Sequence, residues 1–320
     1  MNKDLFYLFI LLIIFIVVLI IFIKINNKSN YENFSNNRQI IFLRKNETCS
    51  LINNIDYFYD FTEADIYARK LVSKKNAIFE TYCDGFKNFT KNDKDKITNA
   101  INTIDDNDSD NELLKNFSFA KISRDVEFGY PHTHKDTIFM SHDTIHQNLK
   151  DLIYVIVHEQ MHVMQRKKPE AFKNLYLNYL NFKQGRLVLG DSFVRLIRSN
   201  PDTRFNPDNE FIYDDGDGNY YYLNAFFKAN QPDNLGDVEY LAIKCNHSRA
   251  QNGNDIFIAT SEKTEINSLK NFNRFFNISG NHYHPNEISA ELISFYFSNK
   301  NKEPSPALMM IDSWIKNKLI

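Results

Sequence analysis

The sequence predicts an α+β domain, rich in helices and with a small mixed β-sheet, that stands behind an N-terminal transmembrane helix. Three observations lead to this prediction. Residues 148–168 form a long, largely apolar segment with caps typical of a buried helix. Short stretches that alternate apolar and polar residues, as strands do, come before and after it. Residues 5–23 form an uncharged run that is almost entirely Leu, Ile, Val and Phe.

The apolar run at residues 5–23 is long enough to cross a bilayer, because a helix rises 1.5 Å per residue and the hydrocarbon core is roughly 30 Å thick. A cleaved signal peptide is the alternative, but its apolar core is usually shorter and ends in small residues. We therefore expect residues 1–4 to be a flank and residues 5–23 to be a single-pass membrane anchor. Lys3 before the run and Lys24 and Lys28 after it leave the side of the membrane open.

Charge and cysteine content narrow the classes of partner and compartment only slightly. The 320 residues carry a net charge of −2 and show no basic patch interleaved with aromatic residues, so we expect no nucleic-acid partner. Cys49, Cys83 and Cys245 are widely spaced and contain no C-x-x-C pair. They fit one disulfide plus a free thiol in an oxidising compartment, or three thiols in the cytosol.

After the anchor, residues 24–57 begin polar and Asn-rich, and we expect them to be a tether in which residues 39–43 have the composition of a strand. Residues 58–320 would then form one domain. The apolar spacing predicts helices at 62–79 and 91–104, and alternation predicts strands at 117–124 and 136–141. Residues 105–110 are acidic but lack the Gly and the closing Glu of an EF-hand, which indicates a solvated loop. His132 and His134 stand in a loop where they can bind a metal or remain solvated.

Beyond residue 168 we expect the elements of a second half of the domain. They are a helix at 169–180, turns at 200–202 and 206–208, a hairpin at 211–223, strands at 238–244 and 255–259, and a helix at 266–276. Residues 185–280 would be an inserted lobe, and nothing in them indicates chemistry.

The segment His158-Glu159-Gln160-Met161-His162 is an H-E-x-x-H motif. Residues four apart lie on one face of a helix, so both imidazoles can reach one metal ion, while Glu159 lies where it can take a proton from a water molecule. Six apolar residues at 152–157 precede the motif and indicate a buried helix. Burying two His and a Glu there costs free energy unless they have a binding partner, which favours a metal site. A chance match to the motif is the alternative.

A catalytic zinc ion normally takes three protein ligands, so the chain must supply one more. Pro285 suits the first turn of a helix on which Glu287 and Glu291 lie four apart, and two like charges on one apolar helix indicate a cation beside them. We expect Glu287 to bind the metal and Glu291 to accept the ring N–H of a ligand His. His282 and His284 are alternative third ligands.

An H-E-x-x-H followed by N-E-x-x-x-[DE] on a later helix resembles the gluzincin group of zinc metallopeptidases, of which thermolysin is a familiar member. The match covers residues 148–168 and 285–299 and the strand at 136–141. The resemblance implies a zincin-like fold, a Zn²⁺ cofactor and a peptide or protein substrate. It also implies that residues 136–141 are an edge strand that pairs with substrate, although an ordinary sheet strand fits them equally. The layout is similar to membrane-tethered metallopeptidase-like proteins of giant DNA viruses.

Two features depart from the gluzincin pattern. The distance from His162 to Glu287 is 287 − 162 = 125 positions, longer than the usual connection, and no His follows His284 to stabilise the transition state. We expect Tyr283 and His284, with His282 beside them, to polarise the carbonyl instead. A polar loop without catalytic duty is the alternative for these three residues.

Together these observations predict a membrane-anchored zinc metallopeptidase. Zinc held by His158, His162 and Glu287 would activate a water molecule, and Glu159 would take its proton and pass it to the leaving amine. One alternative is a catalytically inactive protein of the same fold that binds a partner at the membrane. The other is an anchored interaction protein whose H-E-x-x-H is accidental.

Overall fold

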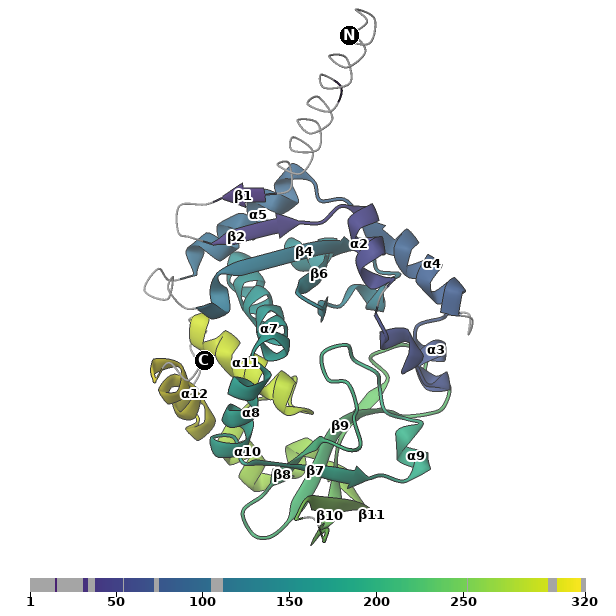
Figure 1. Cartoon of the computed structure of the whole chain (residues 1–320), viewed down its shortest axis with the longest axis vertical. Helices are drawn as coiled ribbons and strands as arrows, with labels where there is room; N and C mark the ends of the chain where they lie inside the picture. Colours follow the sequence, from purple (N-terminus) through teal and green to yellow (C-terminus); the bar gives the residue numbers. More distant parts are fainter. Residues whose placement is uncertain are drawn as a thin grey trace, which may run out of the picture.

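The computed structural model describes residues 15, 31–33, 38–53, 55–71, 75–104, 112–251, 253–298 and 304–317. Figure 1 shows two parts, a helix-flanked sheet and a β-barrel, with helix α7 (Leu149–Lys167) between them. The chain that forms the barrel lies between α7 and helix α11 (Pro285–Phe297) in sequence, yet these two helices pack against each other. The two helices that carry the predicted metal ligands therefore meet where the two parts join.

The first part contains a mixed sheet of six strands. Five of them follow the order β1 (Tyr31–Asn33), β2 (Gln39–Phe42), β4 (Asn116–Ile122), β6 (Thr137–Ser141), β5 (His132–His134), and β3 (Phe86–Lys87) pairs with β4. The β2–β4 and β4–β6 pairs are parallel, and the others are antiparallel. Alternate side chains of β4 face opposite sides, as the period of a strand requires: Phe119 enters one apolar cluster and Ala120 another.

Helices cover both faces of this sheet. One face packs against α7 and α5 (Lys91–Thr103), and the other packs against α2 (Lys45–Ile52) and α4 (Lys75–Gly85). A disulfide between Cys49 and Cys83 joins α2 to α4, while Cys245 is a buried free thiol in the barrel. The pairing selects the first of the two cysteine arrangements that the sequence allowed.

Helix α7 begins and ends where its sequence predicts. The side chain of Asn148 accepts a hydrogen bond from the Asp151 backbone N–H at 3.0 Å and so caps the first turn. Arg166 and Lys167 lie in the last turn, and Pro169 then begins α8 (Pro169–Asn178). The middle of α7, residues 156–165, is buried throughout. The H-E-x-x-H motif is thus part of the core rather than of a surface helix.

Helix α11 is positioned by the C-terminal helices. It packs against α12 (Pro306–Lys316), which in turn contacts α10 (Lys270–Phe276). His284 is the N-cap of α11, and its Nδ1 accepts the Asn286 backbone N–H at 3.1 Å. Trp314 of α12 is fully buried, with its ring 5.3 Å from that of Phe172 in α8. These contacts help to set the position of α11 relative to α7.

The second part is a closed five-stranded barrel. Its order is β10 (Val238–Arg249), β11 (Asp255–Glu265), β7 (Phe182–Val188), β8 (Glu210–Asp214) and β9 (Tyr220–Phe227). The parallel pairing of β7 with β11 closes it, with Arg186 opposite Ile256. A Cβ at Gly185 would lie 2.5 Å from the carbonyl oxygen of Asp255, so the two strands can approach only because residue 185 has no side chain.

The predicted zincin-like fold behind a transmembrane helix is wrong. The structure is α+β, but it combines the six-stranded sheet with a closed barrel that the sequence did not predict. Among the described residues, none of the helices combines the length and the apolar composition needed to cross a bilayer, which contradicts the predicted single-pass localisation. Apart from Phe15, the predicted span at residues 5–23 lies outside the described residues, as do residues 1–4 and the acidic stretch at 105–110.

Several local predictions also change. The helix expected at 62–79 is two helices, α3 (Glu63–Ala68) and α4, because Lys70 adopts a left-handed conformation with φ of 54°. Residues 39–52, expected within the tether, form β2 and α2. Residues 136–141 provide an inner strand, since β6 pairs with β4 on one side and β5 on the other. The edge strand is β5, and its His132 and His134 are buried rather than solvated.

A buried ion cluster connects the sheet part to the loop that leaves the barrel at residues 198–203, here called the site loop. Arg69 of α3 donates to Glu127 at 3.0 and 3.1 Å and to Asp65 at 2.6 Å. Its other nitrogen donates to the backbone oxygen of Ser199 at 2.8 Å, and Asp65 accepts from the Ser199 backbone N–H and hydroxyl. One guanidinium therefore pairs with two buried carboxylates and fixes the site loop.

We expect the substitution Arg69→Met to lower the free energy of unfolding by roughly 3–5 kcal/mol, because it leaves Asp65 and Glu127 buried without their cation. Urea unfolding followed by circular dichroism measures the change. Arg204→Met is the matched control, since the Arg204–Asp60 pair is half-exposed and should contribute less than about 1 kcal/mol. Equal stability of the two variants would contradict the role of the cluster.

Candidate metal centre

Three side chains from α7 and α11 converge on one point. The Nε2 atoms of His158 and His162 lie 3.1 Å apart. The Oε2 atom of Glu287 lies 3.2 Å from the first and 3.7 Å from the second. All three residues are buried, at 6, 1 and 3% exposure. Two imidazoles one helical turn apart and a carboxylate 129 residues away in sequence therefore share a single small volume.

The spacing of these three atoms fits a metal ion. Zinc binds His nitrogen and carboxylate oxygen at roughly 2.0–2.2 Å, and tetrahedral angles then place the ligand atoms roughly 3.3 Å from one another. The observed separations of 3.1, 3.2 and 3.7 Å bracket this value. The structure thus contains a buried His–His–Glu group that can hold a metal ion.

The orientation of His162 is fixed by Gln165. The Gln165 amide nitrogen donates to the backbone oxygen of Asn286 at 2.8 Å and to the Ser289 hydroxyl at 3.1 Å. Its oxygen therefore faces His162 and lies 2.9 Å from Nδ1. This arrangement places the proton of a neutral imidazole on Nδ1 and leaves the Nε2 lone pair for a metal. Gln165 therefore orients the ring of His162 toward the point where the three side chains meet.

Glu287 is held in the same way from its other oxygen. Asn200 of the site loop donates to Glu287 Oε1 at 2.9 Å, so Oε2 is the oxygen that faces the imidazoles. Burial raises the pKa of Glu287, but the neighbouring His162 and the hydrogen bond from His158 lower it more, and the net pKa is well below its usual range. Burial lowers the pKa of His162, yet Asp202 and Glu287 raise it to about 9. The centre therefore favours a positive charge between these groups.

Glu291 lies one turn further along α11, on the Nδ1 side of His158. Its Oε2 atom is 3.7 Å from that nitrogen, longer than a hydrogen bond, and it accepts from Asn281 at 3.2 Å. The Nδ1 atom of His158 is buried and has no hydrogen-bond partner among the described residues. The predicted partners are thus adjacent in space, and Glu291 is the carboxylate placed to accept this ring proton.

Glu159 is buried at 5% exposure beside the three ligand atoms. Its Oε2 atom has no hydrogen-bond partner in the described part of the chain. Burial raises the pKa of Glu159, His158 lowers it, and the carboxylate of Asp202 raises it again, so that the net pKa is well above the usual range. When it is ionised, this free oxygen can accept a proton from a water molecule, and the raised pKa means that the proton is held more tightly than by an exposed Glu.

Asp202 is a further acid close to the centre. Glu159, His162 and Asp202 form a second geometrically possible metal group. We favour the group with Glu287 because the oxygens of Asp202 already accept from the Thr133 backbone N–H at 3.1 Å, from the Thr133 hydroxyl and from Arg166 at 3.0 Å. Through these bonds Asp202 connects β5 to α7.

The two predicted catalytic residues before α11 differ in position. Tyr283 lines the cavity described below, and its hydroxyl accepts from Asn200 at 2.7 Å and from Arg198 at 3.0 Å. With both acceptor positions filled, its own proton is left to donate. His284 instead caps α11 through Nδ1 and is not among the cavity-lining residues, and burial lowers its pKa to about 4. His282 also lies outside the cavity lining, with its ring 5.2 Å from Tyr240.

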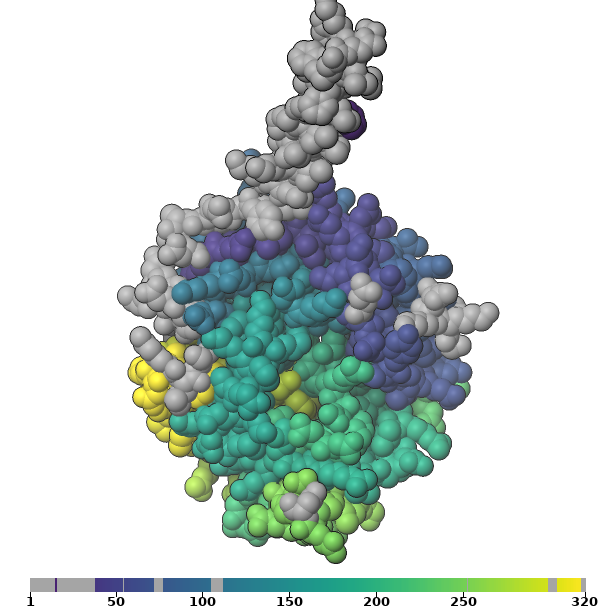
Figure 2. Space-filling view, in the orientation of Figure 1, coloured from purple at the N-terminus to yellow at the C-terminus, as the bar shows by residue number. Residues whose placement is uncertain are grey.

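A cavity of about 400 Å³ opens onto the centre. His158, Glu159, His162 and Glu287 form part of its wall, and residues 198–202 of the site loop form another part. In Figure 2 a patch in the yellow of the C-terminal segment is visible between teal and green segments near the middle of the molecule, where α7, α11 and the barrel meet. The centre is therefore accessible to a ligand while its metal-binding atoms remain buried.

The sequence predicted the three side chains that converge here but not the groups that hold them in place. Arg198, Asn200 and Asp202 all come from the range that we expected to lack chemistry. In the sequence this segment was marked only by the Asn-Pro-Asp turn at 200–202. Such a pattern predicts a turn but does not show where the turn lies in the fold. Contacts with Arg69 and Asp65 bring this turn to the centre.

Comparisons of this chain with protein-family models, with curated proteins and with solved structures gave no match.

We expect Gln165→Ala to weaken zinc binding roughly 10–100-fold, because His162 loses the group that fixes its ring and its tautomer. Competition with a chromogenic chelator measures the affinity, and a thermal melt in the same buffer shows whether the variant is folded. Gln147→Ala is the control, since Gln147 is exposed just before α7. Unchanged affinity in folded Gln165→Ala would show that this hydrogen bond does not orient the ligand.

Proposed function

We propose that this protein is a zinc-dependent hydrolase that cleaves peptide bonds, with His158, His162 and Glu287 as the metal ligands. One observation carries the proposal: three ligand atoms converge at metal-binding distances in a cavity wall, next to a buried Glu159 with an unpaired oxygen. Burial of several charged groups destabilises a fold unless they are paired with one another or with a bound cation.

The donor set favours zinc among the common metals. Two imidazole nitrogens and one carboxylate oxygen form a set that zinc uses in hydrolytic sites, with a further position left open. Magnesium and calcium prefer sites made of oxygen atoms alone. The order of the motifs along the chain, which resembles that of gluzincins, supports the same metal and the same ligands.

When bound at these residues, zinc supplies Lewis-acid polarisation of a carbonyl group and makes water more acidic. Glu159 lies beside the ligand atoms and has the free oxygen to take a proton from the attacking water. Its raised pKa favours holding that proton until it is passed to the leaving nitrogen. The two proton transfers return Glu159 to its starting state.

Tyr283 and Arg198 provide donors in the wall of the same cavity. The Tyr283 proton can be given to the carbonyl oxygen as negative charge develops on it. The Arg198 guanidinium lies 5.2 Å from the centre of the Tyr283 ring and donates to its hydroxyl, which makes that hydroxyl a stronger donor. This pair fills the role for which the sequence offers no downstream His.

The cavity suits a short segment of peptide. A volume of about 400 Å³ lies within the range of small-ligand sites, which is roughly 300–1,000 Å³. Its wall combines polar side chains with apolar and aromatic ones, among them Pro131, Val155, Leu235 and Tyr240. The backbone N–H of Thr133 on edge strand β5 is already bonded to Asp202, so substrate would be held by the cavity side chains more than by strand addition.

We expect the full-length chain to cleave members of a fluorogenic peptide library in a zinc-dependent manner, and Glu159→Gln to reduce kcat/KM roughly 10²–10⁴-fold. The amide keeps the size of the side chain but cannot accept the proton. Removal of metal with 1,10-phenanthroline should abolish cleavage, and added Zn²⁺ should restore it.

The matched control is Glu170→Gln, which alters an exposed acid on α8 and should leave the rate unchanged. Metal analysis of each variant separates two failures. Stoichiometric zinc without cleavage of any peptide would indicate a metal-binding protein without this activity. The absence of zinc in the wild type would refute the centre itself.

A further inference from the structure

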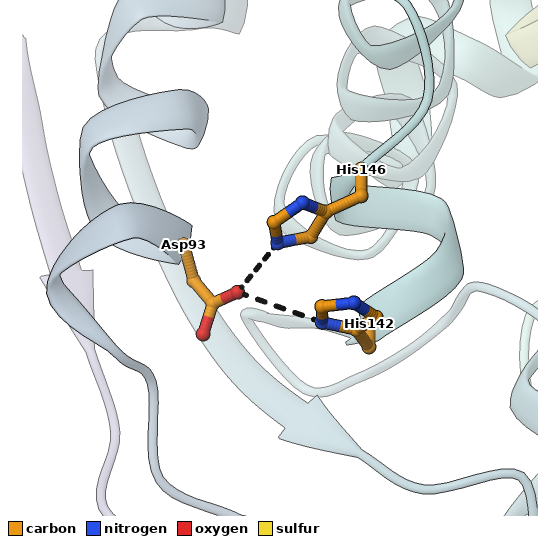
Figure 3. A group of neighbouring side chains, drawn as sticks. All are labelled: Asp93, His142 and His146. Carbon is orange, nitrogen blue, oxygen red and sulfur yellow. Dashed lines mark hydrogen bonds and ion pairs between the residues drawn. The ribbon is translucent and has the colours of Figure 1, made fainter.

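A second group of metal-binding side chains lies away from the cavity, on the helices that flank the first sheet. Figure 3 shows Asp93 on α5 facing two imidazoles from another segment. His142 is the first residue of α6 (His142–Ile145), and His146 is its C-cap. This segment connects β6 to α7, so the group stands just before the helix that carries the H-E-x-x-H motif.

The three side chains aim ligand atoms at one another. The Nε2 atom of His146 lies 3.0 Å from Asp93 Oδ1, and the Nδ1 atom of His142 lies 4.0 Å from the same oxygen. The two rings are stacked, with centroids 4.1 Å apart. Tetrahedral zinc needs ligand atoms roughly 3.3 Å apart. Because the His142 side chain is 65% exposed, a small rotation of it can bring the third ligand atom to that distance.

Asp93 is held ready to present one oxygen. Its Oδ2 atom accepts from the Thr90 backbone N–H and hydroxyl, both at 2.7 Å, and from Lys121 at 2.6 Å. These three bonds fix the carboxylate, which is 1% exposed, and leave Oδ1 directed at the histidines. Lys121 also offsets part of the negative charge, so an ion here should bind more weakly than at a centre with an unshared carboxylate.

We propose that Asp93, His142 and His146 form a second, solvent-accessible site for a divalent transition-metal ion such as Zn²⁺. The site has two imidazole nitrogens, one buried and oriented carboxylate oxygen, and an exposed side at which water completes the coordination. It is separate from the candidate metal centre, because none of its residues lines the cavity.

The chain contains an internal comparison for this site. His247 and Asp255 on the barrel form a similar pair, with 2.8 Å between Nε2 and Oδ1. A basic side chain, Arg249, stands 3.5 Å from the same oxygen where the second imidazole would have to be. That pair therefore has one metal-binding nitrogen and a competing cation. At Asp93 a second imidazole faces the same oxygen, so three possible ligand atoms are available to one metal ion.

An ion at this site would join α5 to the segment that leads into α7. Asp93 lies in the first turn of α5, and His146 stands three residues before Leu149, where α7 begins. Helix α5 also packs directly on α7. Metal binding would therefore stabilise the start of the helix that carries His158 and His162, without contact with substrate.

Equilibrium dialysis of the metal-stripped, full-length chain against micromolar Zn²⁺, followed by metal analysis, tests the proposal. We expect the His142→Ala/His146→Ala variant to bind one ion fewer per chain than the wild type. This difference of one does not depend on whether the candidate metal centre is loaded. We expect His142→Ala alone to weaken this second binding step, measured by calorimetry, by roughly tenfold or more. His142 is exposed, and the His146–Asp93 hydrogen bond remains in this variant.

His247→Ala is the matched control and should bind as many ions as the wild type. Thermal melts without metal should be the same for wild type and His142→Ala, which separates loss of a ligand from loss of structure. Equal zinc content in the wild type and the double variant would overturn the proposal, as would loss of the same ion in His247→Ala.

Discussion

The structure depends on the burial of several charged groups between α7 and α11. Glu159 and Glu287 are almost fully buried, together with the imidazoles of His158 and His162, on helices whose other buried side chains belong largely to the apolar core. Isolated charges in such a region would cost several kcal/mol each. Glu287 and the two imidazoles are paired or oriented by neighbours, and a cation between these groups would offset the cost that remains. The packing of α7 against α11 and the arrangement of the charged side chains at the centre therefore depend on each other.

The barrel contributes to the centre through its connections rather than through its strands. The site loop leaves the barrel and returns to it, and between these points Asn200 donates to Glu287 and Arg198 donates to Tyr283. Arg69 fixes this loop to the sheet part through the backbone of Ser199. A change in the barrel can thus alter the centre without a contact to the metal, because both parts of the fold share one polar network.

The fold was predictable where short-range patterns decide it. The apolar spacing and the caps gave α5, α7, α8 and α11 nearly to the residue, and alternation gave most of the strands. The barrel was not predictable, since its closure depends on the parallel pairing of β7 with β11, some seventy residues apart, and on a glycine at 185 that only the paired geometry explains. The edge of the first sheet stayed open for the same reason: residues 132–134 were expected in a loop, and only the pairing of β5 with β6 shows which strand is the edge.

The sequence by itself determined which imidazoles can act together as metal donors, because the four-residue spacing of His158 and His162 on a helix places both rings on one face whatever surrounds them. It also predicted that Glu287 would meet them, since a buried carboxylate requires a cation. Only the tertiary structure decided which groups hold these ligands in place. Gln165 and Asn200 have no distinguishing pattern in the chain, and their roles arise from the side chains that folding brings within hydrogen-bond distance.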